Sequence, residues 1–359
     1  MSLTDYRLLG RSGLRVSPLS LGTMTFGDDW GWGADADGSR RQLDAYLDRG
    51  GNFIDTANAY TNGSSERLLG QFLEGRRERA VLATKYTLSL HPGDPNAGGN
   101  HRKAMLRSVE ESLRRLRTDY IDLLYLHAWD GTTPVEEVIR GFDDLVRQGK
   151  VLYAGVSDIP AWQAARMQTL ADLRGWTPLV ALQVEYSLAQ RDAERDLAPM
   201  AGALGLGLVA WSPLAMGILA GKYSRADLDA DAGSDDPTAV SDTRRDVAKS
   251  HAMLTERNLA IADEVVAVAR DVGRSPAQVA LAWLLRRPDR PIPIIGARTF
   301  EQFEDNLGAL DLQLDDAHAR RLDDASAIQL GFPHDFLRLK APRMLMTGGT
   351  HILPRHPAA

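Results

Sequence analysis

The sequence predicts a (β/α)8 barrel, in which eight parallel β-strands alternate with α-helices. Two observations lead to this fold class. Eight short apolar runs alternate with amphipathic stretches, and the runs are mostly continuously apolar rather than alternating, as strands buried on both faces of a parallel sheet are. Each strand–helix unit requires a right-handed crossover, and eight such units close into a barrel. A doubly wound open sheet is the alternative, but no GxGxxG motif follows the first expected strand.

The expected strands follow one another along most of the chain. They comprise residues 16–23, 52–57, 80–86, 121–127, 151–157, 179–186, 205–211 and 292–297. Amphipathic helices are expected between them, for example over 101–118, 134–148 and 275–286. The second of these begins with a threonine N-cap and a proline at the first helical position, and Ser275 and Pro276 repeat that start.

Three segments do not fit the repeat. Residues 3–16 contain the turn GRSG between short apolar segments, which predicts a hairpin. Residues 223–250 are rich in Asp, Ala, Ser and Gly and predict a long loop after strand seven. The tail, residues 331–359, is rich in Pro, Gly and His and either folds over the barrel mouth or is disordered. We expect one barrel domain over 1–359, with its core at about 16–310, although the length would also hold two average domains.

Composition excludes several classes of function. The 359 residues are 44% hydrophobic and 25% charged with a net charge of −6, and the basic residues are scattered, so no nucleic-acid partner is expected. The absence of cysteine excludes disulfides and thiolate metal sites, and no metal is expected. The N-terminus lacks a secretory h-region, and no apolar window of about 18 residues occurs. We therefore expect a cytoplasmic protein without a membrane partner, with a homo-oligomer possible.

Four titratable residues lie at the ends of three neighbouring strands. Asp55 ends strand two, with Tyr60 in the loop that follows, Lys85 ends strand three, and His127 ends strand four. Active sites of such barrels form where the strands end. Each residue alone would ordinarily be a solvated side chain, but their joint position on one rim predicts a catalytic group.

The chemistry of this group follows from the residue types. A free tyrosine has a pKa of about 10, and a nearby cation lowers it. Lys85 can supply that cation, and Asp55 can keep a partly buried ammonium charged. His127 can orient a carbonyl oxygen by hydrogen bonding. The sequence thus predicts that Tyr60 acts as a general acid–base catalyst.

The motifs DTANAY, ATKY and LLYLHAWD resemble the aspartate–tyrosine–lysine–histidine tetrad of the aldo-keto reductase superfamily. The likeness runs from about residue 6 to about 328 of the chain. Within the superfamily, GTMTFG (22–27) and HAWDGTTPVEE (127–137) resemble the bacterial aryl-alcohol dehydrogenase-like branch, close to the potassium-channel β-subunits. The resemblance implies NADP(H)-dependent reduction of aldehydes and ketones, with Tyr60 protonating the carbonyl oxygen.

The resemblance also implies a set of cofactor contacts. Those near the nicotinamide are Gly22, Thr23, Met24, Asp55, Ser157, Asp158, Gln183 and the stacking residue Trp211. Those near the phosphates are Ser212, Pro213, Leu214, Gly217, Leu219 and Lys222, where small residues let backbone N–H groups approach an anion. Those toward the adenosine are Gly296, Arg298, Gln302, Asp305 and Asn306, with Arg244 closing over the cofactor from the strand-seven loop.

Two departures from the superfamily pattern concern cofactor and substrate. Asp158 stands where many members carry asparagine, and a carboxylate accepts hydrogen bonds but cannot donate them. Trp211 stands where tyrosine is common.

The charged residues Arg298 and Lys222 favour NADP over NAD. NADP carries a 2′-phosphate that NAD lacks, and a guanidinium group pairs bidentately with phosphate. The expected walls of the substrate pocket are Trp30, Trp32, Tyr86 and Trp129, which suit a carbonyl compound with an apolar body.

Two other readings of the same residues remain open. Lys85 on this barrel is also compatible with a Schiff-base nucleophile. The likeness to channel β-subunits allows a non-catalytic NADP(H)-sensing subunit.

Overall fold

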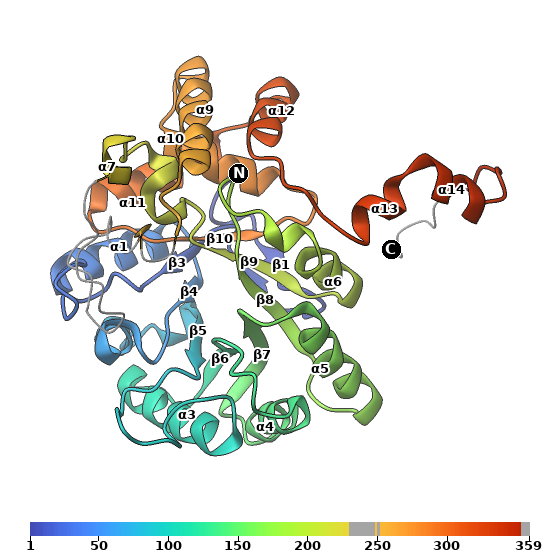
Figure 1. The fold of residues 1–359 in the computed structure, drawn as a ribbon. Helices are drawn as coiled ribbons and strands as arrows, with labels where there is room; N and C mark the ends of the chain where they lie inside the picture. Colours follow the sequence, from blue (N-terminus) through green and yellow to red (C-terminus); the bar gives the residue numbers. More distant parts are fainter. Residues whose placement is uncertain (230–247, 250–251, 353–359) are drawn as a thin grey trace. The chain divides into compact units, whose positions relative to one another are not determined.

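The structure is a computed structural model that describes residues 1–229, 248–249 and 252–352. A closed barrel of parallel strands lies at its centre, in the order β10-β3-β4-β5-β6-β7-β8-β9 (Figure 1). These strands are β3 (Ser20–Gly22), β4 (Phe53–Asp55), β5 (Val81–Tyr86), β6 (Ile121–Leu126), β7 (Val151–Ser157), β8 (Leu179–Glu185), β9 (Gly207–Trp211) and β10 (Ile292–Ile295). The predicted (β/α)8 barrel is confirmed, and the open sheet is excluded because β10 pairs with both β9 and β3.

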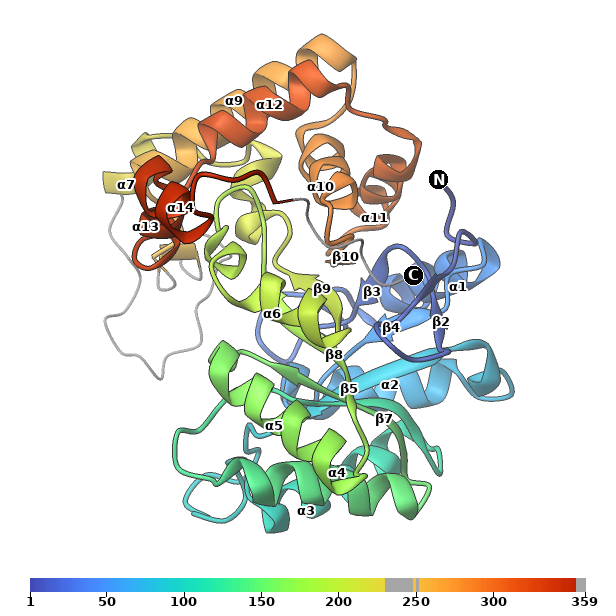
Figure 2. The same cartoon turned by 90° about the vertical axis from the view of Figure 1, so that its right-hand side faces the viewer.

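Helices surround the strands (Figure 2). Those of the barrel unit are α1 (Ala36–Asp48), α2 (Ser64–Phe72), α3 (Arg102–Leu116), α4 (Val135–Arg147), α5 (Ala161–Arg174), α6 (Leu197–Leu204), α7 (Ala226–Asp229), α9 (Glu256–Val272), α10 (Pro276–Arg286), α11 (Phe300–Leu307) and α12 (Asp316–Ala325). Among the described helices, none is long and apolar enough to cross a membrane.

Two details of the sequence prediction were wrong. The first expected strand, 16–23, is divided: Val16 belongs to the hairpin, and the barrel strand begins only at Ser20. Pro134 occupies the N-cap position of α4 rather than its first helical position, with ψ at 135°. The threonine before it instead donates its hydroxyl to Asp130 at 2.7 Å. The cap of α10 is confirmed, since the Ser275 side chain accepts from the Gln278 N–H.

The predicted hairpin is confirmed, and it closes one end of the barrel. It consists of β1 (Arg7–Leu8) and β2 (Arg15–Val16), paired antiparallel. Leu9 and Val16 are fully buried and pack in one cluster with inward-facing strand residues such as Phe53 and Tyr125. At Gly10, with φ at +56°, a Cβ atom would lie 2.3 Å from the Val180 carbonyl oxygen, so only glycine allows this close approach.

The chain divides into two compact units, Met1–Ser326 and Ala327–Ala359. The second unit holds the predicted tail and contains two short helices, α13 (His334–Arg338) and α14 (Lys340–Met346). The predicted long loop after strand seven begins with α7, and its residues 230–247 lie outside the described part of the chain. Arg244, expected to close over the cofactor, is among those residues.

Candidate active site

Asp55, Lys85 and Tyr60 meet at the mouth of the barrel, where β4 and β5 end. The Lys85 ammonium donates to Asp55 Oδ1 at 2.6 Å, to the Thr56 carbonyl oxygen at 2.9 Å and to the Tyr60 hydroxyl oxygen at 3.0 Å. The strand pairing produces this arrangement, because Asp55 lies opposite Ala83 on β5 and Lys85 is the next inward-facing residue along that strand.

The Lys85 ammonium is fully buried, and all three of its N–H donors are used. Burial acts to lower the pKa of Lys85, but Asp55 and Tyr60 outweigh it, so the pKa is raised above its ordinary value. The ammonium therefore stays charged at neutral pH. A Schiff-base nucleophile requires a neutral amine with an accessible lone pair, so this environment argues against that role for Lys85.

The Tyr60 hydroxyl is held in its protonated form. Burial raises the pKa of Tyr60, and the opposing effect of Lys85 does not cancel it. The expected net lowering of the tyrosine pKa was therefore wrong, because desolvation is stronger than the attraction of the ammonium. Since the Tyr60 oxygen accepts from Lys85, its own O–H remains available to donate into the cavity.

His127 follows β6, and its ring packs edge-on against the Tyr60 ring, with 5.9 Å between the ring centroids. Burial, followed by the Lys85 charge, lowers the pKa of His127 to about 3. The imidazole is thus neutral near pH 7, with one N–H to donate. Its Nδ1 atom is buried without a hydrogen-bond partner.

The neutral state of His127 leads to a prediction about the pH dependence of kcat/KM. For an uncharged aldehyde, we expect kcat/KM to show no titration near pH 6.5, because the imidazole loses its proton only near pH 3. Steady-state kinetics between pH 5 and 8 measure this. A limb near pH 6.5 that disappears in His127→Gln would contradict the assignment.

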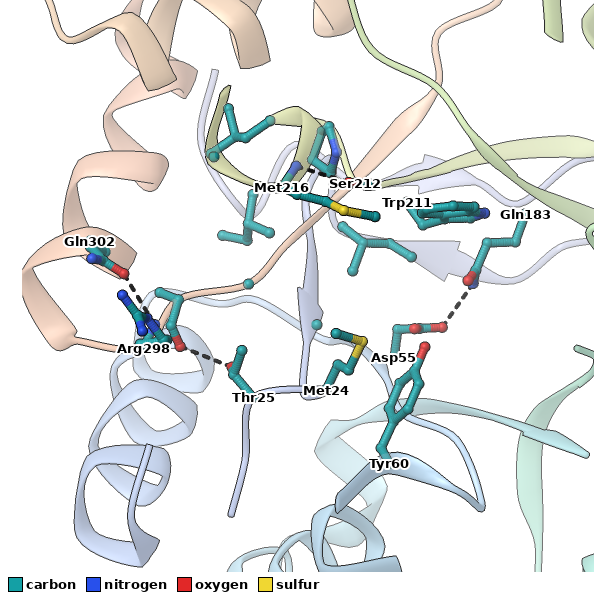
Figure 3. A pocket seen from close by; sticks show the side chains of 18 of the residues that line it. Met24, Thr25, Asp55, Tyr60, Gln183, Trp211, Ser212, Met216, Arg298 and Gln302 are labelled. Atoms are coloured by element: carbon teal, nitrogen blue, oxygen red, sulfur yellow. Dashed lines mark hydrogen bonds between the residues drawn. The ribbon is translucent and has the colours of Figure 1, made fainter. Parts of the chain in front are cut away.

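Gln183 completes the hydrogen bonding of the Asp55 carboxylate. Its Nε2 donates to Asp55 Oδ2 at 2.8 Å, so both carboxylate oxygens of Asp55 accept hydrogen bonds (Figure 3).

Trp211, at the end of β9, donates its indole N–H to Asp158 Oδ1 at 2.9 Å. Asp158 has a φ of +41°, an unusual conformation for a residue other than glycine, which is typical of functional sites. The hydrogen bond between Trp211 and Asp158 fixes the orientation of the indole ring.

A cavity of about 450 Å³ opens beside this group. Figure 3 shows Tyr60, Asp55, Gln183 and Trp211 on one side of the cavity and Arg298 and Gln302 on the other. The structure brings together most of the residues expected from the sequence: the cavity is lined by Gly22, Met24, Trp30, Asp55, Tyr60, His127, Ser157, Asp158, Gln183, Trp211, Ser212, Pro213, Leu214, Gly217, Lys222, Gly296, Arg298 and Gln302.

Other expected cofactor residues lie behind the cavity wall. Thr23 is buried and donates its hydroxyl to the Asp55 carbonyl oxygen at 3.0 Å. Leu219 is fully buried in the core. The Asp305 carboxylate accepts from Ser275 at 2.8 Å and thereby joins α11 to α10. Asn306 is buried and reaches the Gly296 carbonyl oxygen only at 3.5 Å. These side chains support the wall and do not form it.

Three expected substrate-pocket residues are also absent from the cavity lining. Tyr86 is fully buried and packs against Phe142, with 6.0 Å between the ring centroids. Strand alternation explains this, because Lys85 faces the barrel interior and its neighbour must face the helices. Trp129 packs against the same outer core, and Trp32 lies against Trp30 with 5.6 Å between the ring centroids.

The cavity has further walls that sequence reasoning missed. They are Thr25, Ala59, Leu88, Met216, Ala220, Tyr223, Ile294, Ile295 and Ala297. Thr25 donates its hydroxyl to the Ala297 carbonyl oxygen at 2.9 Å and so joins the loops after β3 and β10. A signal was available for Ala59 and Met216, since each adjoins a residue already assigned to the site.

The loop after β9 has a strained backbone where it borders the cavity. Ser212, Ala215 and Met216 have φ of +50°, +48° and +57°, and Gly217 has φ of +100°. The Met216 N–H donates to the Ser212 hydroxyl at 3.2 Å and stabilises this conformation (Figure 3). The Ala215 and Gly217 N–H groups donate to the Ser212 and Leu214 carbonyl oxygens at 2.8 and 2.9 Å, so these N–H groups hold the turn itself.

A closed (β/α)8 barrel with a buried acid–lysine–tyrosine group beside a large cavity is the architecture of a barrel enzyme. The profile of the "Aldo/keto reductase family" matches residues 18–327. The chain therefore belongs to the aldo/keto reductase family, a family of oxidoreductases that generally use nicotinamide cofactors.

Three relatives illustrate the range of the similarity. A norsolorinic acid reductase of Aspergillus flavus is 38% identical over 343 residues, covering 92% of this chain and 84% of the relative. An aryl-alcohol dehydrogenase [NADP(+)] of Phanerodontia chrysosporium is 39% identical, covering 90% and 86%. An uncharacterized oxidoreductase of Bacillus subtilis is 41% identical, covering 89% and 95%. These relatives support carbonyl reduction as the class of reaction.

Proposed function

We propose that the protein is an NADP(H)-dependent reductase of aldehydes and ketones, with Tyr60 as the general acid. The observation that supports this most is the 3.0 Å contact between the Lys85 ammonium and the Tyr60 hydroxyl at one end of a cavity that has Arg298 at the other. The proposed partner is a small carbonyl compound. The proposed location is the cytoplasm, which the lack of cysteine suits.

The cavity walls fit a nicotinamide dinucleotide. Trp211 offers an indole ring fixed by Asp158, and the small residues of the turn from Ser212 to Gly217 let a pyrophosphate approach the backbone closely. Arg298 precedes α11, whose N-terminus favours an anion. We assign Ser157, Asp158 and Gln183 to the nicotinamide side of the cavity, together with Gly22 and Met24. When bound, the cofactor supplies the hydride that reduces the carbonyl carbon.

The protein's own residues then control the proton. The neutral His127 donates its N–H to the substrate oxygen and orients the carbonyl. Tyr60 transfers its hydroxyl proton to the same oxygen as negative charge develops there. Lys85 stabilises the phenolate that remains, because its ammonium already donates to the Tyr60 oxygen. Asp55 keeps the ammonium charged and in place. In alcohol oxidation the same groups act in reverse, with the phenolate as base.

The direct test is oxidation of NADPH by the purified protein with benzaldehyde and simple ketones. Turnover of at least one carbonyl compound is expected. NADPH binding without turnover of any of them would instead support the sensing subunit, and no binding at all would refute both functions.

Preference for NADPH is expected to depend on Arg298. Arg298→Ala should lower the ratio of kcat/KM for NADPH to that for NADH by about 10- to 100-fold, since a hydrogen bond to a charged group is worth about 1.5–3 kcal/mol. Steady-state kinetics with both cofactors measure this. Arg49→Ala is the matched control. Arg49 donates to Glu304 of α11, the helix that Arg298 precedes, at 2.7 Å, but it does not line the cavity. An unchanged ratio in Arg298→Ala would show that Arg298 does not bind the 2′-phosphate that distinguishes NADPH from NADH.

A further inference from the structure

Glu185 is a partly buried carboxylate at the barrel mouth that the proposed mechanism does not use. It is the last residue of β8, two positions after Gln183, so both side chains leave the strand on the same face. That face is the one from which Gln183 reaches Asp55 inside the barrel. Glu185 lies opposite Trp211 in the β8–β9 pairing. The Glu185 carboxylate therefore lies just outside the layer of Gln183, at the mouth.

Among the residues that the structure describes, no cation forms an ion pair with the Glu185 carboxylate. Its Oε1 atom is buried without a hydrogen-bond partner. The charged groups that act on it are Asp158, which follows β7, and Asp192 of η3 (Asp192–Glu194). Burial, together with these two carboxylates, raises the pKa of Glu185 to about 7. Burial raises the pKa of Asp158 above its ordinary value, against the lowering effects of the Trp211 N–H and Lys85.

Basic and acidic side chains lie in different parts of the cavity and its surroundings. Among the described lining residues the Lys and Arg side chains are Lys222 and Arg298, which belong to the loops after β9 and β10. At the Tyr60 end, Lys85 is matched by Asp55 and His127 is neutral. Asp158 lines this end of the cavity, and Glu185 does not line it but lies near enough to Asp158 for the two carboxylates to interact, so both add negative charge here when ionised. Trp30, Ala59 and Leu88 add apolar surface to the cavity lining.

We propose that Glu185, acting with Asp158, makes the active site discriminate against carbonyl substrates that carry a carboxylate. Its substrates are then uncharged or cationic aldehydes and ketones with an apolar body. Glu185 is a specificity-determining residue in this account. The inference rests on the proposed carbonyl reduction and adds a substrate class to it.

The test compares three para-substituted benzaldehydes of similar size: 4-methylbenzaldehyde, 4-formylbenzoate and 4-(trimethylammonio)benzaldehyde. For the wild-type protein, we expect kcat/KM with NADPH to be about tenfold lower for the carboxylate than for the methyl compound, from Coulomb repulsion across the mouth. In Glu185→Gln, kcat/KM for the methyl compound should stay within about twofold, while the penalty for the carboxylate falls several-fold. The preference for the cationic compound should fall as well. Comparing variant with wild type cancels the electronic effect of each substituent.

Two controls separate charge from packing. Glu185→Asp keeps the charge and should keep the discrimination. Asp192→Asn removes a nearby carboxylate that is already paired with Arg195 at 2.9 Å, and should change the discrimination little at pH 8, where Glu185 is already mostly ionised. Should Glu185→Gln fail to fold, the wild-type protein alone supplies a second measurement. Because Glu185 titrates near pH 7, discrimination against 4-formylbenzoate should increase from pH 6 to pH 8.

The outcomes separate this inference from the proposed function. Equal kcat/KM for the carboxylate and methyl compounds would overturn the inference and leave carbonyl reduction intact. Discrimination that persists unchanged in Glu185→Gln, or that does not vary with pH in the wild type, would overturn the role of Glu185. Absence of NADPH oxidation with all three compounds would refute the proposed function itself.

Discussion

Replacing Tyr60 with phenylalanine is expected to lower kcat for aldehyde reduction by about 10²- to 10⁴-fold, the usual contribution of a positioned proton donor. The substitution removes the O–H that faces the cavity and keeps the ring that packs against His127. NADPH should still bind with nearly unchanged affinity, because the loops after β9 and β10 are untouched. Stopped-flow turnover, together with a fluorescence titration of NADPH, measures both quantities.

Tyr86→Phe is the matched control for this substitution. Tyr86 is also a tyrosine of the β4–β5 region, but its hydroxyl donates to the Asn100 carbonyl oxygen at 3.3 Å in the outer core. Its removal should leave kcat within about twofold, since an ordinary hydrogen bond contributes about 1 kcal/mol to stability and none of it to the chemical step. Retention of most activity by Tyr60→Phe would remove Tyr60 as the proton donor.

Lys85→Met is expected to affect activity and stability together. Loss of the ammonium leaves the phenolate of Tyr60 without its stabilising charge, and kcat for reduction should fall by about 10²-fold or more. It also leaves Asp55 as a buried carboxylate without its cation, which costs about 3–5 kcal/mol of the free energy of unfolding. Urea denaturation and steady-state kinetics on the same preparation measure the two effects.

Lys150→Met controls for the loss of a lysine that forms an ion pair. Lys150 pairs with Glu110 at the protein surface, where such a pair contributes about 0–1 kcal/mol, so stability and kcat should change little. A Lys85→Met protein as stable and as active as this control would show that the buried ion pair does not organise the site.

Much of the site was predictable because strand ends converge in a parallel barrel. Asp55, Lys85 and His127 could be placed on one rim from their positions after apolar runs, without knowledge of any helix packing. The same alternation rule would have placed Tyr86 in the outer core once Lys85 was assigned to the interior. The division of the first strand coincides with Pro18, which has no N–H for strand pairing, but residues 16–23 were interpreted as one run.

Properties that depend on burial could not be predicted from local sequence. The net direction of the Tyr60 pKa depends on how strongly the folded protein desolvates the hydroxyl, which outweighs the nearby Lys85. The proximity of Glu185 to Asp158 arises from the pairing of β7 with β8, in which Ser157 lies opposite Gln183. Likewise, Asp305 appeared to be a cofactor contact on α11, whereas the fold directs its carboxylate to Ser275 and Gln278 of α10.

The pH dependence of alcohol oxidation tests most directly whether the Lys85 charge controls the acidity of the Tyr60 hydroxyl. In this direction Tyr60 must lose its proton before it can act as a base, so the rate rises with pH toward the Tyr60 pKa. Without the ammonium, the raising effects of burial, Asp55 and Asp158 remain on that pKa. We predict that the rising limb of kcat/KM lies at clearly higher pH in Lys85→Met than in the wild-type protein. A limb at the same pH in both proteins would contradict the account.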